Sequence, residues 1–140
     1  ERYGGGGALL CMDLDNFKEI NDRYGHDAGD RVLQAIARRL KDKTRSDDTV
    51  SRHGGDEFLY LAMNIANEAD ISLIAEKIIE EIRAPFEISV GDVAISTRIN
   101  ASIGIATFPK PGADADTLVS SADRAMSRAK LDKSGYSFAP

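Results

Sequence analysis

Hydrophobic residues follow two different spacings along the chain, and each spacing predicts its own kind of element. A short continuous apolar run, residues 8–12, is typical of a strand that is buried on both faces. Apolar residues then recur at helical spacing from Phe17 to Tyr24, where Gly25 breaks the pattern. A longer amphipathic segment begins near Asp27 and ends in cations, as a helix C-terminus favours. The first third of the chain is thus predicted to form a strand and two helices.

The middle of the chain predicts a hairpin and a third helix. Two short strands, residues 49–52 and 57–63, flank the pair Gly54 and Gly55, which is a strong hairpin signal. Apolar residues at helical spacing over residues 71–82 then predict an amphipathic helix, which a proline stops. The acidic residues that follow the glycine pair are therefore expected beside a tight turn.

The last third returns to strands before it ends in a helix. A hairpin turning at Gly91 and Asp92 leads into one long alternating strand, residues 93–105. A last helix covers residues 118–129, and residues 136–138 are expected to add a short edge strand. Because strands and helices are interleaved with two hairpins among them, we expect an α/β (α+β) fold with a mixed central sheet flanked by helices.

Composition narrows the class of protein. The 140 residues, 42% of them hydrophobic, suit one domain with a real core. The net charge of −5, from 18 Lys and Arg against 23 Asp and Glu, argues against a nucleic-acid partner, which needs a basic stripe. Cys11, the single cysteine, is predicted to be a reduced core residue of a cytoplasmic protein. No apolar run approaches the ~20 residues of a membrane span, so a membrane is expected only through other parts of a parent protein.

The glycines at positions 4–7 do not form a phosphate-binding loop. No Lys-Ser or Lys-Thr pair follows them, and they lead into a predicted strand rather than a helix. Residues 1–7 are therefore predicted to be a flexible tail.

Three acids are the strongest candidates for chemistry. Asp13 ends the first predicted strand, while Asp56 and Glu57 follow the tight turn, where glycines let a ligand approach the backbone. Three converging carboxylates would repel one another unless a divalent cation neutralised them, and Mg²⁺ (or Mn²⁺) prefers such oxygen ligands. The alternative is that they are ordinary turn and strand-end acids on a solvated rim, and the pattern alone leaves both interpretations open.

Four sequence blocks, in order along the chain, extend over nearly its whole length. They are residues 12–22 with 25–30, residues 52–58 with an intact Gly-Gly-Asp-Glu-Phe pentapeptide, residues 100–106, and residues 122–130. Together these blocks resemble the GGDEF family of diguanylate cyclases.

The resemblance implies a domain that joins two GTP molecules into cyclic di-GMP and releases two pyrophosphates, with each protomer of a head-to-head homodimer holding one GTP. It also implies a fold similar to the palm of class III nucleotide cyclases. The implied site residues are Asp13, Leu14 (backbone carbonyl), Asp56 and Glu57 for the metal, Lys18 with Asp56 and Glu57 for catalysis, and Asn21, Asp30, Gly54, Gly55 and Lys130 for the substrate.

A second site is implied by position within the family. Arg45 and Asp48 form an RxxD pattern at the distance from the glycine pair where the family has a product-inhibition site, with Lys77 in place of a secondary arginine. A guanidinium can pair with a guanine edge or a phosphate, and the aspartate can accept from guanine donors. The alternative is simple helix-end charge, and Lys77 weakens its part of the site because lysine lacks the planar fork.

Several positions also have a plainly structural interpretation. Lys18 suits a solvated helix face, Asn21 a helix end, and Asp30 the N-terminal dipole of the second predicted helix. Asp15 is predicted to be only the N-cap of the first helix. The matched blocks favour the functional roles for the first three of these residues.

The chain departs from the family pattern in ways that support a rival function. The family's opening helix, with a D-x-L-T-x-L-x-N-R segment, is missing ahead of residue 1, and the usual GRN or GKN after Lys130 is replaced by residues 131–136. A phosphate-facing cation is thus lost or displaced to Lys133. The rival is a non-catalytic module of a larger signalling protein that binds GTP or cyclic di-GMP.

Overall fold

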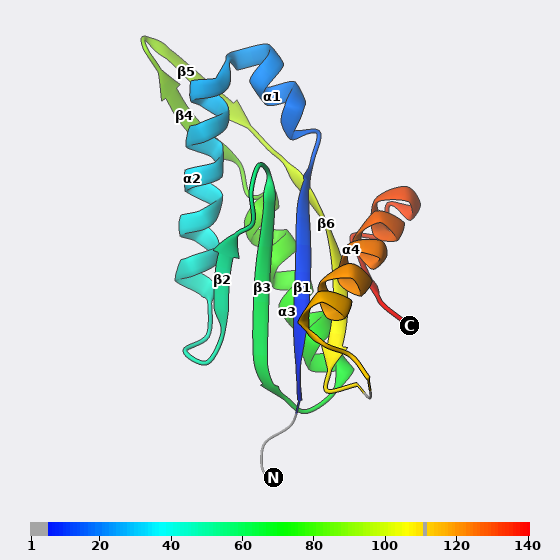
Figure 1. Cartoon of the computed structure of the whole chain (residues 1–140). Helices are drawn as coiled ribbons and strands as arrows, with labels where there is room; N and C mark the ends of the chain where they lie inside the picture. The colour runs from blue at the N-terminus through cyan, green and yellow to red at the C-terminus, as the bar shows by residue number, and fades with distance from the viewer. Residues whose placement is uncertain (1–5, 111) are drawn as a thin grey trace.

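The computed structural model describes residues 6–110 and 112–140 (Figure 1). The predicted flexible tail lies outside the described residues up to position 5. Its last two residues, Gly6 and Gly7, instead begin a strand in which they pair with Ile65 and Phe108. The first strand therefore starts two residues before the apolar run, because backbone pairing needs no side chain.

The described residues form a five-stranded sheet, a separate two-stranded hairpin and four helices. The sheet order is β2-β3-β1-β6-β7, in which all neighbours are antiparallel except the parallel pair β6 and β7. This arrangement confirms the predicted mixed sheet flanked by helices. The elements are β1 (Gly6–Asp15), α1 (Phe17–Tyr24), α2 (His26–Lys43), β2 (Thr49–Arg52), β3 (Glu57–Ile65), α3 (Glu68–Arg83), β4 (Phe86–Val90), β5 (Val93–Thr97), β6 (Asn100–Phe108), α4 (Ala115–Asp132) and β7 (Tyr136–Phe138).

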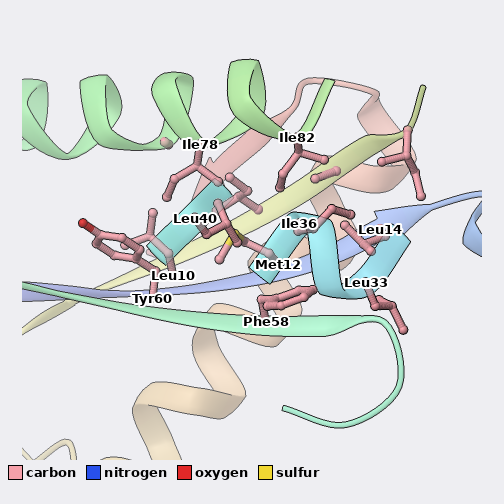
Figure 2. Close-up of a cluster of buried hydrophobic side chains, with 14 of the residues drawn as sticks. Leu10, Met12, Leu14, Leu33, Ile36, Leu40, Phe58, Tyr60, Ile78 and Ile82 are labelled. Atoms are coloured by element: carbon pink, nitrogen blue, oxygen red, sulfur yellow. The ribbon is translucent and has the colours of Figure 1, made fainter. Parts of the chain in front are cut away.

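The central strand β1 is buried on both faces, as its apolar run predicts. Leu10, Met12 and Leu14 pack with apolar residues of α2 and α3, as Figure 2 shows. Leu9 and Cys11 face the other way and pack under α4. Because side chains alternate along a strand, Asp13 lies on the same face of the sheet as Leu9 and Cys11, the face that α4 covers. Figure 1 shows α4 crossing that face, with α3 on the opposite one.

The long alternating strand predicted over residues 93–105 is two strands in the structure. β5 pairs with β4 in the separate hairpin, whereas β6 pairs with β1 in the main sheet. Ala101–Ala106 are all buried, so β6 is covered on both faces, while β5 has a mixture of exposed and buried side chains. Apolar and polar residues alternate through both strands, so the sequence did not reveal that β5 and β6 pair with different strands.

The predicted N-cap role of Asp15 is wrong. Asp15 is the last residue of β1, and its carboxylate accepts from the Ser102 hydroxyl at 3.0 and 3.2 Å. The cap position belongs to Asn16, which has φ 61° and whose side chain makes no capping hydrogen bond. A left-handed residue at this position turns the chain directly from strand into helix, so no capping side chain is needed to change its direction.

The structure also describes the environment of Cys11 and the length and hydrophobicity of the helices. Cys11 is buried and unpaired, and burial is the first cause that raises the pKa of its thiol to about 12. No helix within the described ranges is both long and apolar enough to span a bilayer.

Candidate active site

The Gly-Gly-Asp-Glu-Phe segment forms the tight turn between β2 and β3. The Glu57 N–H donates to the Gly54 carbonyl at 3.0 Å, and the His53 N–H donates to the Glu57 carbonyl at 2.8 Å. Gly54 and Gly55 have φ of 77° and 43°, values that side chains other than glycine rarely adopt. The space where their side chains would stand is open, so a ligand can reach this backbone.

The first acid of this turn lies beside Asp13. β1 and β3 pair Asp13 with Glu57, and the Leu14 N–H donates to the Asp56 carbonyl at 3.3 Å, which extends the ladder into the turn. Burial and then the neighbouring Asp13 carboxylate raise the pKa of Asp56. The strand pairing thus brings two carboxylates together that favour a shared positive charge.

Glu57 is the strand partner of Asp13 and has a further acidic neighbour on α4. Burial raises its pKa first, followed by the charges of Asp123 on α4 and of Asp13. Across residues 6–110 and 112–140, no group of three His, Cys, Asp or Glu side chains is arranged to hold a metal ion. Asp13 and Asp56 are in contact, and Glu57 is the strand partner of Asp13 and also lies near Asp123 of α4.

The pair of Asp13 and Asp56 fits a hard divalent cation. Carboxylate and carbonyl oxygens are the ligands Mg²⁺ takes, and it usually binds one or two carboxylates and completes its shell with water and substrate phosphates. The repulsion that raises the pKa of Asp56 is what such a cation would relieve. Asp13, Asp56 and the Leu14 backbone are the residues here that could hold it.

Lys130 reaches this acid pair from α4. Its Nζ donates to the Asp13 Oδ2 at 2.7 Å, and this hydrogen bond is the main cause that raises the pKa of the lysine. α4 lies close enough because β6 has Gly104 at the crossing, where an added Cβ would collide with the helix backbone at Ala122 and Met126. Gly104 therefore lets α4 approach the sheet closely enough for Lys130 to reach Asp13.

Asn21 and Asp30, the predicted guanine-binding residues, come from two adjoining helices. The Asn21 side-chain oxygen lies against Gly29 so closely that a Cβ there would collide with it, which brings α1 and α2 together. Asp30 follows directly and lines a cleft of about 580 Å³ that the tip of the β4–β5 hairpin also borders at Gly91. Lys18, on the first turn of α1, is exposed, and within the described ranges it has no recorded ion pair with the acids.

Arg45 and Asp48 form a bidentate ion pair in the segment between α2 and β2. Arg45 Nε lies 2.6 Å from Asp48 Oδ2, and NH2 lies 2.8 Å from Oδ1. Burial alone would raise the pKa of Asp48, but the hydrogen bonds from Arg45 and Tyr60 outweigh it, and the net pKa lies below its ordinary value. The two residues are therefore partners of one another before any ligand arrives.

Lys77 lies with Arg45 on one cleft. Both line a cavity of about 370 Å³ between α2 and α3, which Lys43 and Tyr60 border as well. The two predicted cations of the product site thus line the same cavity, although they come from segments about thirty residues apart.

Three residues near these sites were not predicted. Tyr60 lay in the predicted strand 57–63 without a role, Asp123 was part of a matched block without a role, and Ser102 was assigned no partner. The Tyr60 hydroxyl donates to Asp48, and the Ser102 hydroxyl donates to Asp15. Asp123 lies near Glu57. Each contact joins residues distant in sequence, which spacing alone does not reveal.

Comparison with known proteins identifies the family of this chain. The diguanylate cyclase, GGDEF domain family matches residues 2–135. The bifunctional diguanylate cyclase/cyclic di-GMP phosphodiesterase MucR of Pseudomonas aeruginosa is 44% identical over 94% of the chain and 18% of its own length. The crystal structure of the GGDEF domain of YfiN, or TpbB, from the same organism superposes with a TM-score of 0.88 at 41% identity, covering 96% of this chain and 83% of that one.

A structure solved with a nucleotide is also similar. The GGDEF domain of DgcB from Caulobacter crescentus, in complex with c-di-GMP, superposes with a TM-score of 0.83 at 25% identity, over 96% of this chain and 76% of that one. The chain belongs to the GGDEF family of diguanylate cyclase domains. It spans less than a third of the length of two of these curated relatives, 18% of MucR and 29% of the cyclase TpbB.

Proposed function

We propose that this domain is a Mg²⁺-dependent diguanylate cyclase that condenses two GTP molecules into cyclic di-GMP and two pyrophosphates. The observation that carries the proposal is the contact of Asp56, in an intact Gly-Gly-Asp-Glu-Phe turn, with Asp13, next to the Lys130 ammonium. Phosphoryl transfer needs positioning and charge neutralisation more than covalent chemistry. This cluster offers both at the end of a rigid sheet.

In this proposal each residue has a defined task. A divalent cation, when bound by Asp13, Asp56 and the Leu14 carbonyl, would neutralise charge on the GTP phosphates. Glu57, whose pKa is raised by burial and neighbouring acids, would take the proton of the attacking 3′-hydroxyl. The oxygen of that hydroxyl then bonds to the α-phosphorus of the partner's GTP, and the bond to pyrophosphate breaks.

The remaining residues would hold the substrate. Asn21 and Asp30 would read the guanine edge, where an amide and a carboxylate match its donors and acceptors. Lys18 and Lys130 would face the phosphates, and the open glycines of the turn would let the phosphates approach the backbone. Lys130 can exchange Asp13 for a phosphate because its side chain is half exposed.

We also propose that cyclic di-GMP inhibits the domain by binding at Arg45, Asp48 and Lys77. The cleft that Arg45 and Lys77 share supports this role. The rival function is a module that binds GTP or cyclic di-GMP without turning it over. The curated relative PdeR of Escherichia coli, 40% identical over 87% of this chain and named only a cyclic di-GMP phosphodiesterase, favours this alternative.

One incubation separates the two functions. With GTP and Mg²⁺, chromatography should detect cyclic di-GMP, and Asp56→Ala should reduce its formation at least a hundredfold because an acid of the metal pair is lost. Asp116→Asn, an exposed acid at the far end of α4 from Lys130, serves as the matched control and should retain activity. Binding of GTP without any product would refute the cyclase assignment. Full turnover by Asp56→Ala would refute the metal-binding role of Asp56 and leave the cyclase assignment standing.

A further inference from the structure

The Asp48 carboxylate is saturated with hydrogen bonds from the protein. Arg45 donates to both of its oxygens at 2.6 and 2.8 Å, the Tyr60 hydroxyl donates to Oδ2 at 2.6 Å, and the Met63 N–H donates to Oδ1 at 3.0 Å. A carboxylate has about four lone-pair sites. The Asp48 side chain is also fully buried. It therefore has neither the free acceptor nor the exposure to bind a ligand directly.

Arg45, in contrast, keeps one end free for a ligand. Its Nε and NH2 are held by Asp48, and NH2 also donates to the Met63 carbonyl at 2.8 Å. Within the described residues, no protein acceptor is recorded for NH1, and the arginine side chain is 45% exposed on the cleft that it shares with Lys43 and Lys77. The two N–H groups of NH1 are thus the part of this ion pair that a phosphate or a guanine edge can reach.

Tyr60 connects this ion pair to the core. Its ring lies at one end of the apolar cluster under α2 and α3, with the hydroxyl pointing away from the cluster, as Figure 2 shows. Burial, and then the hydrogen bond to Asp48, raise the pKa of Tyr60 to about 12, so the hydroxyl remains a donor throughout the physiological range. Because a packed aromatic ring has little rotational freedom, this donor is fixed in place.

We propose that Tyr60 is a positioning residue for product inhibition, acting through Asp48 to hold Arg45 ready for cyclic di-GMP. This inference rests on the proposed inhibitory site. It assigns contact with the ligand to Arg45 and Lys77, which line the cleft, and support of Arg45 to Asp48 and Tyr60. An unsupported arginine loses most of its rotational freedom when a ligand binds, which weakens affinity. A side chain that is already fixed avoids that loss.

Calorimetric titration of the protein with cyclic di-GMP tests the chain of contacts. Tyr60→Phe keeps the ring and removes the hydroxyl, and we expect about three- to tenfold weaker binding. In an Arg45→Ala background the same substitution should cause no further loss, because its effect passes through the arginine. Phe58→Leu is the matched control, since it disturbs the same face of β3 without touching the ion pair, and it should bind as the wild type does.

The outcomes separate this inference from the site on which it rests. Wild-type binding by Arg45→Ala would overturn the inhibitory site and the role of Tyr60 with it. Weak binding by Arg45→Ala together with wild-type binding by Tyr60→Phe, or an equal loss in Phe58→Leu, would overturn the positioning role and leave the site standing. An additive loss in the double variant would also overturn it, because the hydroxyl would then act independently of Arg45.

Discussion

The Asp48 carboxylate has a structural task besides any role in regulation. β2 pairs with β3 only as far as Leu61, and the Met63 peptide beyond that point has its N–H bound by Asp48 and its carbonyl bound by Arg45. The ion pair thus continues the edge of the sheet with side chains where the strand has ended. A buried ion pair need not add stability as a set, but removing one member is destabilising because it leaves the others buried and unpaired.

We expect Asp48→Asn to destabilise the domain by about 1–3 kcal/mol at neutral pH. The amide keeps the shape but directs a donor at Arg45 or at the Met63 N–H. Because the pKa of Asp48 is lowered in the folded protein, its stabilisation is present above the unfolded carboxyl pKa of about 3.9 and is lost as the pH falls through the folded value. Urea denaturation at pH 7 and near pH 3 should therefore show a gap between wild type and variant that narrows in acid.

Asp47→Asn provides the comparison for this prediction. Asp47 is the exposed neighbour of Asp48, and its recorded hydrogen bond is a long one, 3.3 Å from Asn64. Its substitution should change the unfolding free energy by less than about 0.5 kcal/mol. A stability gap for Asp48→Asn that does not depend on pH would contradict the ionic explanation.

At the same scale, the sequence revealed residues by type and spacing, and missed contacts between distant segments. Arg45 and Asp48 are three residues apart, so their pairing follows from the pattern. Tyr60 is twelve residues from Asp48, and the predicted strand 57–63 gave no indication of that contact. Asp15 was predicted to be a helix N-cap because aspartate is common at that position. In the structure the N-cap is Asn16, whose left-handed backbone connects β1 to α1.

At the scale of elements, the pattern predicted which elements form better than it predicted which elements pair. The third helix, the β2–β3 hairpin and the short edge strand β7 all form as expected, since each depends on local periodicity and turn residues. The split between β5 and β6 was missed because both continue one alternation, while the choice of partner strand is decided by the sheet. The pairing of β6 with β1 matters for the candidate site, because α4 packs on β6 and is thereby held next to β1.

Gly104 tests how this packing serves the site. In Gly104→Ala the new methyl group would collide with the backbone of α4, so the helix must move outward at a cost of about 1–3 kcal/mol. Lys130 moves with the helix and loses its contact with Asp13. Thermal unfolding should therefore shift downward, and cyclase activity measured well below the new melting temperature should fall as well.

Ser127→Ala is the control for Gly104→Ala. This exposed position lies on α4 itself, so the variant changes the helix without disturbing its contact with β6. It should leave both melting temperature and activity near those of the wild type. If Gly104→Ala lost stability but kept full activity in the folded state, the distance between α4 and β1 would not matter for the chemistry.

At the scale of the whole molecule, the proposed reaction requires two substrate sites. In the proposal, Asp13, Asp56, Lys130 and the cleft at Asp30 bind one GTP, whereas the product needs two. The second site must then come from a second protomer that presents the same surface. With a net charge of −5 on each chain and further charge on each nucleotide, such an encounter is opposed by long-range repulsion, so it is expected to be weak without a cation.

This argument makes protein concentration the decisive variable. If two GTP-loaded protomers must meet, the rate of cyclic di-GMP formation per protomer should rise in proportion to protein concentration while most of the protein is monomeric, and level off once dimers dominate. Initial rates over a hundredfold range of concentration, at saturating GTP and Mg²⁺, would show this dependence. Mixing wild type with increasing Asp56→Ala should lower the rate per wild-type protomer, because mixed pairs hold one impaired site. If the specific activity stayed constant over concentrations at which the protein is mostly monomeric, one protomer would complete the reaction alone.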